Sequence, residues 1–176
     1  MSSPIKHIVR FVFFLFTQIF VLNQIPPLHH RVDLYIYFLF ILWLPFNTTR
    51  LAQLIWGFLL GITLDYFTKS PGLHASACVL IAYLRPFLIN LLIPQQGTEV
   101  NYEEPSIRSL SFAPYAIYVV TLTIIHHAYL FLLEAIQFAD IFYFIEKTLF
   151  SAAASLVLIL IVELLFVRKQ RFRTNA

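Results

Sequence analysis

Long apolar segments recur along this chain, separated by clusters of Pro, Gly, Asn or charged residues. A helix needs about 20 residues to cross a hydrocarbon core of roughly 30 Å, and several of these segments approach that length. The composition agrees, because 60% of the 176 residues are hydrophobic and only 12% are charged. The sequence therefore predicts an all-α polytopic membrane protein, folded as a single helical bundle over residues 1–176. The six expected transmembrane helices are residues 9–25, 34–46, 51–67, 73–93, 112–137 and 143–167.

The second and third of these segments are shorter than a standard membrane helix. Residues 34–46 and 51–67 therefore either span the membrane with little tilt, break, or form a re-entrant hairpin. The polar tip at residues 47–50 indicates that the tip reaches water, because it includes Arg50 and a charge at the bilayer centre costs several kcal/mol. Either arrangement leaves both termini on the same side of the membrane.

The basic residues predict which side that is. Most Lys and Arg residues fall on the side that holds the termini, and an excess of these residues marks the cytoplasmic side. The residues concerned are Lys6, Arg10, Arg50, Arg108, Arg168, Lys169, Arg171 and Arg173. Both termini and the loop of residues 93–109 are therefore expected to be cytoplasmic, and this loop is either an ordinary solvated loop or a docking surface. No basic stripe interleaved with aromatic residues occurs, so nucleic acid is not an expected partner.

A stripe of small residues leads to a carboxylate on the third segment. Gly57, Gly61 and Asp65 are spaced i, i+4 and i+8, so they lie on one helix face. Faces of this kind allow membrane helices to pack closely. The matching small residues of the next segment are Ala75, Cys78 and Ala82. We therefore expect the two segments to form an antiparallel hairpin with their backbones close together.

A short turn near residues 69–70 sets the register of this hairpin. It pairs Gly57 with Ala82, Gly61 with Cys78, and Asp65 with His74. This register places Asp65 near the outer membrane surface, where His74, Thr68 or backbone donors can satisfy the carboxylate. We expect Asp65 to fix the hairpin turn, and the alternatives are an ion- or substrate-binding role and a contact with a partner.

Arg85 lies in the cytoplasmic half of the same hairpin. A separation of ~16 Å along the helix axis, at 1.5 Å of rise per residue, is too long for a direct pair with Asp65. Glu163 in the last segment lies at a similar depth, so we expect an Arg85–Glu163 ion pair; the alternative is that Arg85 snorkels to the interface. Because Arg85 precedes Pro86, residues 86–93 either leave the helix along the interface or continue it with a tilt.

Two adjacent histidines lie near the middle of the fifth segment. His126 and His127 are level with Ser151 and Ser155, and we expect them to hydrogen-bond these hydroxyls or backbone groups. Proton relay or ligand contact is the alternative. Adjacent helical residues point about 100° apart, so one metal ion cannot easily bind both rings.

Glu134, near the outer surface, is level with Lys147 and is expected to pair with it. No catalytic motif accompanies these polar residues, since the sequence has no H-E-x-x-H, no G-x-S-x-G and no phosphate-binding glycine loop. Cys78 is the single cysteine, so no intramolecular disulfide can form. We therefore expect no enzyme activity and no metal or cofactor.

Residues 57–86, GFLLGITLDYFTKSPGLHASACVLIAYLRP, resemble the most recognisable stretch of the MreD family of bacterial rod shape-determining membrane proteins. The matching features are Gly57, Gly61 and Asp65, the short turn with Gly72, and the Ala- and Ser-rich start and IAYL of the next helix. The chain length, the short second segment and the basic C-terminal tail fit that family as well.

The resemblance implies a non-catalytic, multi-pass subunit of the bacterial inner membrane, in the elongation machinery that builds side-wall peptidoglycan. Besides membrane lipid, the expected partner is an MreC-like protein, which connects such a subunit indirectly to MreB filaments, to the glycosyltransferase RodA and to a penicillin-binding transpeptidase. A scaffold of this kind is expected to present an aromatic-rich apolar face, such as residues 35–43, to a partner's transmembrane helix.

The MreD family is also held to resemble the six-helix substrate-binding S components of energy-coupling-factor vitamin transporters, which implies an alternative. The chain would then be the substrate-binding membrane subunit of a small-molecule transporter. That role requires a closed polar pocket with several converging donors, whereas the intramembrane polar residues of this sequence are spread over different depths.

Overall fold

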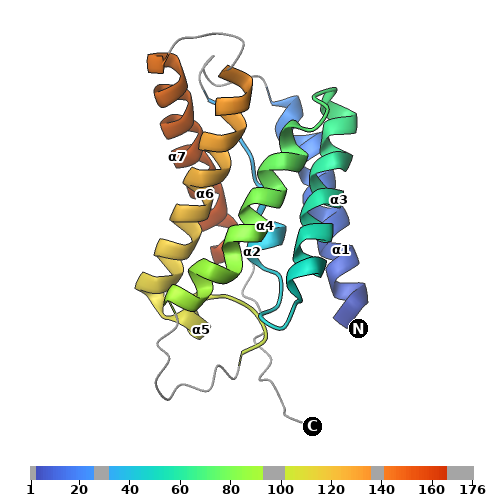
Figure 1. The fold of residues 1–176 in the computed structure, drawn as a ribbon, viewed down its shortest axis with the longest axis vertical. Helices are drawn as coiled ribbons and strands as arrows, with labels where there is room; N and C mark the ends of the chain where they lie inside the picture. The colour runs from blue at the N-terminus through green and yellow to red at the C-terminus, as the bar shows by residue number, and fades with distance from the viewer. Residues whose placement is uncertain (1–2, 26–31, 93–101, 136–140, 166–176) are drawn as a thin grey trace.

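The computed structural model describes residues 3–25, 32–92, 102–135 and 141–165. These segments fold into helices that run side by side in a bundle, and no strand occurs within them (Figure 1). The helices are α1 (Ser3–Phe16), its π-helical extension η1 (Thr17–Val21), its 3-10 extension η2 (Leu22–Gln24), α2 (Leu39–Leu42), α3 (Arg50–Thr68), α4 (Leu73–Leu92), α5 (Ile107–Leu110), α6 (Phe112–Ala135) and α7 (Ile141–Leu165).

Five helices within the described segments are long and apolar enough to cross a membrane. They are the continuous helix over Ile5–Gln24, and α3, α4, α6 and α7. The described residues are therefore helical as expected, and their five long apolar helices fit a multi-pass membrane protein. Of the alternatives for residues 34–46, a break holds, because only the four residues of α2 are α-helical there, and the sixth transmembrane helix expected at this segment is wrong. The other short segment differs, since α3 has 19 residues and is itself long enough to span a bilayer.

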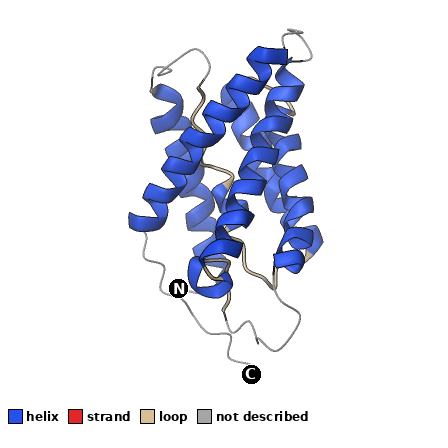
Figure 2. Cartoon of the chain, turned by 90° about the vertical axis from the view of Figure 1, so that its left-hand side faces the viewer, coloured by secondary structure: helices blue, strands red, loops and turns tan. Residues whose placement is uncertain are grey.

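Residues 32–46 instead run through the middle of the bundle. This internal segment begins beside η2 at one end of the bundle, makes the single turn of α2, and reaches the start of α3 at the other end (Figures 1 and 2). Each residue from Ile36 to Leu44 is at most 4% exposed. Irregular backbone is tolerated at membrane depth where protein buries it. A short apolar run does not reveal whether protein or lipid surrounds it, which is why the sequence misled here.

The burial of the internal segment also removes one expected docking face. The aromatic-rich run of residues 35–43 was expected to face a partner helix, but Tyr37, Phe38 and Phe40 are at most 1% exposed. That expectation is wrong, because the aromatic rings fill the core between the helices.

α3 and α4 pack against each other as the antiparallel hairpin that their small residues predict. A Cβ added at Gly57 would lie 3.0 Å from the Cys78 carbonyl oxygen and 3.1 Å from the Ala82 Cβ. A Cβ added at Gly61 would lie only 2.5 Å from the Ala75 nitrogen. The pairing of Gly57 with Ala82 is confirmed, but Gly61 lies against Ala75 rather than Cys78. The two backbones are therefore closest near the turn.

α4 continues through Pro86 to Leu92, so the helix does not end at Arg85. Neighbouring groups in a membrane bundle can satisfy the backbone that an internal proline leaves free. Of the two alternatives for residues 86–93, continuation of the helix therefore holds as far as Leu92. Residue 93 itself, Glu99, and the basic residues 168–173 of the C-terminal tail lie outside the described residues.

The loop that follows residue 101 lies at the end of the bundle where α1 begins and α7 ends (Figure 1). Glu104 in this loop accepts hydrogen bonds from Lys6 at 2.7 Å and from Arg10 at 2.8 Å. The Glu103 carbonyl accepts the backbone N–H of Phe46 at 2.9 Å. The loop thus ties the first helix to the end of the internal segment.

Candidate functional site

Asp65, in the last turn of α3, organises the α3–α4 turn. Its Oδ1 accepts the backbone N–H and the ring Nδ1–H of His74, each at 2.8 Å. Its Oδ2 accepts the backbone N–H groups of Gly72 and Ala75, each at 3.0 Å. These backbone donors belong to the start of α4, where intrahelical acceptors are lacking and the helix dipole favours a negative charge. The predicted contact of Asp65 with His74 is confirmed, and both carboxylate oxygens are engaged by the turn.

The turn itself has two residues with positive φ, Lys69 at 58° and Gly72 at 84°. Gly72, which the sequence placed in the turn, adopts this conformation without a steric cost. The Ser70 hydroxyl lies 2.6 Å from the Thr68 hydroxyl and 3.2 Å from the His74 Nδ1. A compact polar network therefore closes this end of the hairpin.

Gln18, in the π-helical turn η1, supplies a partner for the internal segment. Its side chain is fully buried, accepts the N–H of Ile36 at 2.9 Å and donates to the Leu34 carbonyl at 2.9 Å. An unsatisfied backbone group costs several kcal/mol at membrane depth. The Gln18 side chain supplies the hydrogen bonds that a neighbouring strand would give to the backbone of Leu34 and Ile36. Sequence reasoning missed this residue, although a lone Gln within an apolar helix was an available signal.

Two serines of α7 complete the support of the same backbone. The Ser151 hydroxyl accepts the N–H of Asp33 at 2.9 Å, and the Ser155 hydroxyl accepts the N–H of Tyr35 at 3.2 Å. Both serines are fully buried. The two serines that were expected to hydrogen-bond the histidines therefore also anchor the internal segment.

His126 and His127 have different partners. The His127 Nδ1 donates to the Thr123 carbonyl at 2.8 Å, which leaves its Nε2 to accept from the Ser155 hydroxyl at 3.0 Å. The His126 Nε2 lies 2.9 Å from the Tyr37 hydroxyl. The predicted serine contact is confirmed for His127, whereas His126 contacts the internal segment instead.

A serine hydrogen-bonded to a histidine is also the core of a nucleophile–base pair. Here Ser155 and His127 are both fully buried, and the second ring nitrogen is held by a backbone carbonyl rather than a carboxylate. Ser155 additionally accepts the Tyr35 N–H. This geometry fits a structural hydrogen bond within the core.

Arg85 does not pair with Glu163, so that prediction is wrong. Arg85 is 1% exposed, which also contradicts snorkelling to the interface. Its Nε donates to the Tyr118 hydroxyl at 3.1 Å, and its Nη2 donates to the Leu44 carbonyl. The Tyr118 hydroxyl donates in turn to the Leu42 carbonyl at 2.9 Å. Arg85 therefore holds the end of the internal segment. The Leu44 and Leu42 carbonyls that it reaches, directly and through Tyr118, are backbone groups whose positions could not be predicted from the sequence.

Glu163 and Glu134 lie at opposite ends of the bundle. Glu163 accepts from the Trp43 Nε1 at 2.9 Å and from the Tyr115 hydroxyl. Glu134 accepts from Lys147 through both oxygens, at 2.9 and 2.8 Å, which confirms the predicted pair. Lys147 also lies 3.1 Å from the Asp33 Oδ2, a contact that the sequence did not suggest.

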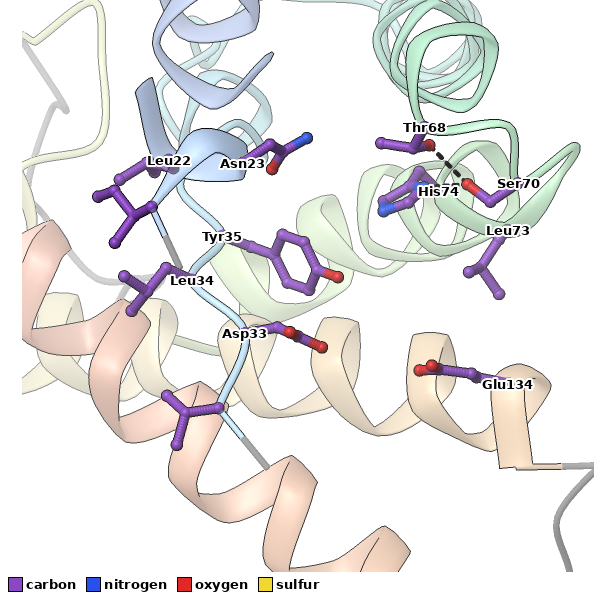
Figure 3. Close-up of a pocket in the computed structure, with 12 residues that line it drawn as sticks. Leu22, Asn23, Asp33, Leu34, Tyr35, Thr68, Ser70, Leu73, His74 and Glu134 are labelled. Carbon is purple, nitrogen blue, oxygen red and sulfur yellow. Dashed lines mark hydrogen bonds between the residues drawn. The ribbon is translucent and has the colours of Figure 1, made fainter. Parts of the chain in front are cut away.

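A cavity of about 360 Å³ opens beside Glu134, at the end of the bundle that holds the α3–α4 turn. Its walls come from η2, the start of the internal segment, the α3–α4 turn and the end of α6 (Figure 3). The lining residues are Leu22, Asn23, Ile25, Val32, Asp33, Leu34, Tyr35, Thr68, Ser70, Leu73, His74 and Glu134. Polar groups that lie far apart in the sequence thus line one cavity, because the internal segment places Asp33 and Tyr35 at this end of the bundle.

Within the described segments, no group of three His, Cys, Asp or Glu side chains is placed to hold a metal ion. Cys78 is buried in the hairpin, where its carbonyl faces Gly57. Comparison with models of known protein families, with curated proteins and with solved structures finds no match for this chain. The hairpin, the anchored internal segment and the cavity are therefore the features from which a function can be proposed.

Proposed function

We propose that this chain is a non-catalytic membrane subunit that scaffolds the bacterial cell-elongation machinery, the role that its resemblance to MreD implies. The supporting observation is the hairpin of residues 57–86, which carries the resemblance and is tightly interlocked. Gly57 and Gly61 admit the backbone of α4, and Asp65 binds its first turn. A rigid hairpin inside an apolar bundle suits a protein that positions partners in the membrane.

The bundle is proposed to cross the bacterial inner membrane six times, five times as a helix and once as the internal segment. α1 and α3 begin, and α7 ends, at one end of the bundle, where α5 also lies (Figure 1). Lys6, Arg10, Arg50 and Arg108 belong to these elements, so this end is proposed to be cytoplasmic by the positive-inside rule. The cavity and the α3–α4 turn then face the periplasm.

The outer faces of α1 and α3 are proposed to contact the transmembrane helix of an MreC-like partner. These helices lie side by side at one edge of the bundle (Figure 1), and Phe20 of η1, which continues α1, contacts Phe67 of α3 with ring centroids 6.4 Å apart. The exposed aromatic residues of these elements are Phe13 and Phe16 of α1, Phe20 of η1, and Phe58, Tyr66 and Phe67 of α3. They take the place of residues 35–43, which are in the core, as the proposed contact.

Site-specific crosslinking tests this scaffold proposal. A photoreactive residue replaces either Phe16 on α1 or Val157 on α7, which are 57% and 58% exposed and so form a matched pair. We expect an MreC-like protein to crosslink from position 16 and not from position 157, and depletion of the chain to round rod-shaped cells. Normal cell shape after depletion, without an MreC-like partner in mild-detergent purifications, would contradict the proposal.

The cavity favours a second candidate function, the substrate-binding subunit of a small-molecule transporter. That role requires converging polar groups, and Asp33, Tyr35, His74 and Glu134 line one space. Recovery of an energising ATPase with the purified chain, together with loss of uptake on depletion, would support this candidate over the scaffold.

A further inference from the structure

The cavity beside Tyr35 has the size of a small-molecule site. Its volume of about 360 Å³ lies within the range of roughly 300–1,000 Å³ that ligand pockets occupy. Leu22, Leu34 and Leu73 share the lining with polar groups. An occupant therefore needs both an apolar part and a polar part.

Two carboxylates give the described lining of the cavity its charge. The side chains of Asp33 and Glu134 are 37% and 43% exposed, so both reach open space. Lys147 bonds to both carboxylates, but its side chain is only 9% exposed and it does not line the cavity. Two negative charges and one positive charge leave one net negative charge on this wall. A negative wall beside a low-dielectric bundle attracts a cation.

Tyr35 faces this wall across the cavity. Its ring packs edge-to-face with the His74 ring at a centroid distance of 5.7 Å, and its hydroxyl points into the open space (Figure 3). The hydroxyl hydrogen-bonds to no other described residue. A tyrosine ring attracts an adjacent cation, and the free hydroxyl can accept an N–H from it.

We propose that this cavity binds a small organic ammonium ion, with the charged nitrogen at Asp33 and Glu134 and the apolar part against Tyr35 and the leucines. The ammonium group can belong to a free amine or to the head group of an aminophospholipid. The proposal depends on the cavity lining and not on the scaffold role, and under the transporter alternative it names the class of cargo.

Three probes of one shape test the charge requirement. Benzylamine, benzyl alcohol and benzoate share a ring and differ in charge, and each is titrated calorimetrically into the full chain in phosphatidylglycerol nanodiscs. We expect benzylamine to bind about tenfold more tightly than the other two. Equal binding of the three probes, preference for benzoate, or no binding of benzylamine to the folded chain would overturn the proposal.

Substitutions of opposite expected sign separate binding from folding. Glu134→Gln should weaken benzylamine binding about tenfold, whereas Lys147→Met should strengthen it by a similar factor, because it frees both carboxylates. Damage to the fold alone cannot improve binding. Glu163→Gln, which removes a carboxylate at the other end of the bundle, is the matched control and should leave binding unchanged. A Lys147→Met protein that is folded but binds benzylamine no better would contradict the proposed contact.

A change of lipid distinguishes the two sources of the ammonium group. Loss of benzylamine binding in phosphatidylethanolamine nanodiscs would identify the lipid head group as the occupant, and unchanged binding would identify a free amine. None of these measurements involves a protein partner, so their failure would leave the scaffold proposal standing.

Discussion

The α3–α4 hairpin and the internal segment of residues 32–46 are both held by buried polar contacts, yet the partners in these contacts come from opposite places. The hairpin supplies its own partners, since Asp65 binds the first turn of the helix that follows it. The internal segment depends on side chains from other elements, among them Gln18, Ser155 and Arg85. Contacts within a hairpin leave a spacing pattern in the sequence, whereas contacts between the internal segment and distant elements do not.

The largest loss of stability is expected when the hairpin backbones are forced apart. In Gly61→Ala the new Cβ would lie 2.5 Å from the Ala75 nitrogen, a backbone atom that cannot rotate away. Overpacking costs about 1–3 kcal/mol and more where the backbone must move, so we expect at least about 3 kcal/mol here. SDS titration of the purified chain, followed by circular dichroism, measures this loss.

Gly57→Ala is the matched comparison on the same helix face. Its new Cβ would meet Cys78 and Ala82 at 3.0–3.1 Å, so a smaller shift relieves the contact. We expect a clearly smaller loss of unfolding free energy than for Gly61→Ala. Equal effects, or a larger effect at Gly57, would mean that the hairpin is not closest near its turn.

The next largest effect is expected where the internal segment loses a distant partner. Gln18→Leu keeps the volume of the side chain but leaves the Ile36 N–H and the Leu34 carbonyl without it. Each buried unpaired group costs about 1–3 kcal/mol, and we expect about 2–3 kcal/mol in total because the membrane-embedded unfolded state also finds partners. The same SDS titration provides the measurement.

Gln24→Leu is the control for that change. Gln24 is exposed, and its bond to the Ile19 carbonyl is long, at 3.5 Å. We expect its substitution to change the free energy of unfolding by less than about 0.5 kcal/mol. A Gln18→Leu protein as stable as Gln24→Leu would show that the internal segment does not need side-chain partners.

The same division explains which contacts could be predicted from the sequence. Asp65 with His74 and Glu134 with Lys147 join neighbouring helices across short connections, so helical rise and small-residue spacing located both pairs. Arg85 could not be located in this way, because its partners include the Leu44 carbonyl, and every residue has a carbonyl. The conformation of the internal segment decides which carbonyl is free.

The cavity was missed for the same physical reason. A helix over residues 34–46 would have satisfied its own backbone, and nothing would then have required the polar side chains of Gln18, Ser151 and Ser155 to converge on it. The apolar composition of these residues is compatible with a lipid-facing helix and with a buried irregular chain. Only the second arrangement brings Tyr35 beside His74.

Asp65→Asn tests the self-contained character of the hairpin with a moderate expected effect. Asparagine keeps one acceptor oxygen, but its NH₂ group replaces the second oxygen. That NH₂ group then faces the N–H groups of Gly72 and Ala75, which lose their acceptor. We expect a loss of about 1–2 kcal/mol, as for the removal of a helix N-cap, measured by SDS titration. Thr63→Val, which removes a hydroxyl that bonds only to the Leu59 carbonyl of the same helix, should be close to neutral. Unchanged stability of Asp65→Asn would contradict a role for the charge.

The smallest effect is expected at Glu104, whose loop holds the end of the internal segment that precedes α3, through the Glu103 carbonyl and the Phe46 N–H. Burial alone would raise the pKa of Glu104, but the charges of Arg10 and Lys6 outweigh it and lower the pKa below its ordinary value of 4.5. The carboxylate therefore stabilises the folded chain above that pH, and the stabilisation is lost as the pH falls through the lowered pKa.

Comparison of the wild type with Glu104→Gln across pH measures this contribution. Lys6 is partly exposed and solvent screens the cluster, so we expect a difference in unfolding free energy of up to about 1 kcal/mol at pH 7. The difference should begin to shrink as the pH falls below 4.5, the ordinary pKa of a glutamate, and should be lost as the pH falls through the lowered pKa of the folded state. Glu103→Gln, which neutralises the exposed neighbour and keeps its carbonyl, should show no such pH dependence. A difference that stays constant from pH 7 to pH 3 would mean that the charge of Glu104 does not hold the loop against α1.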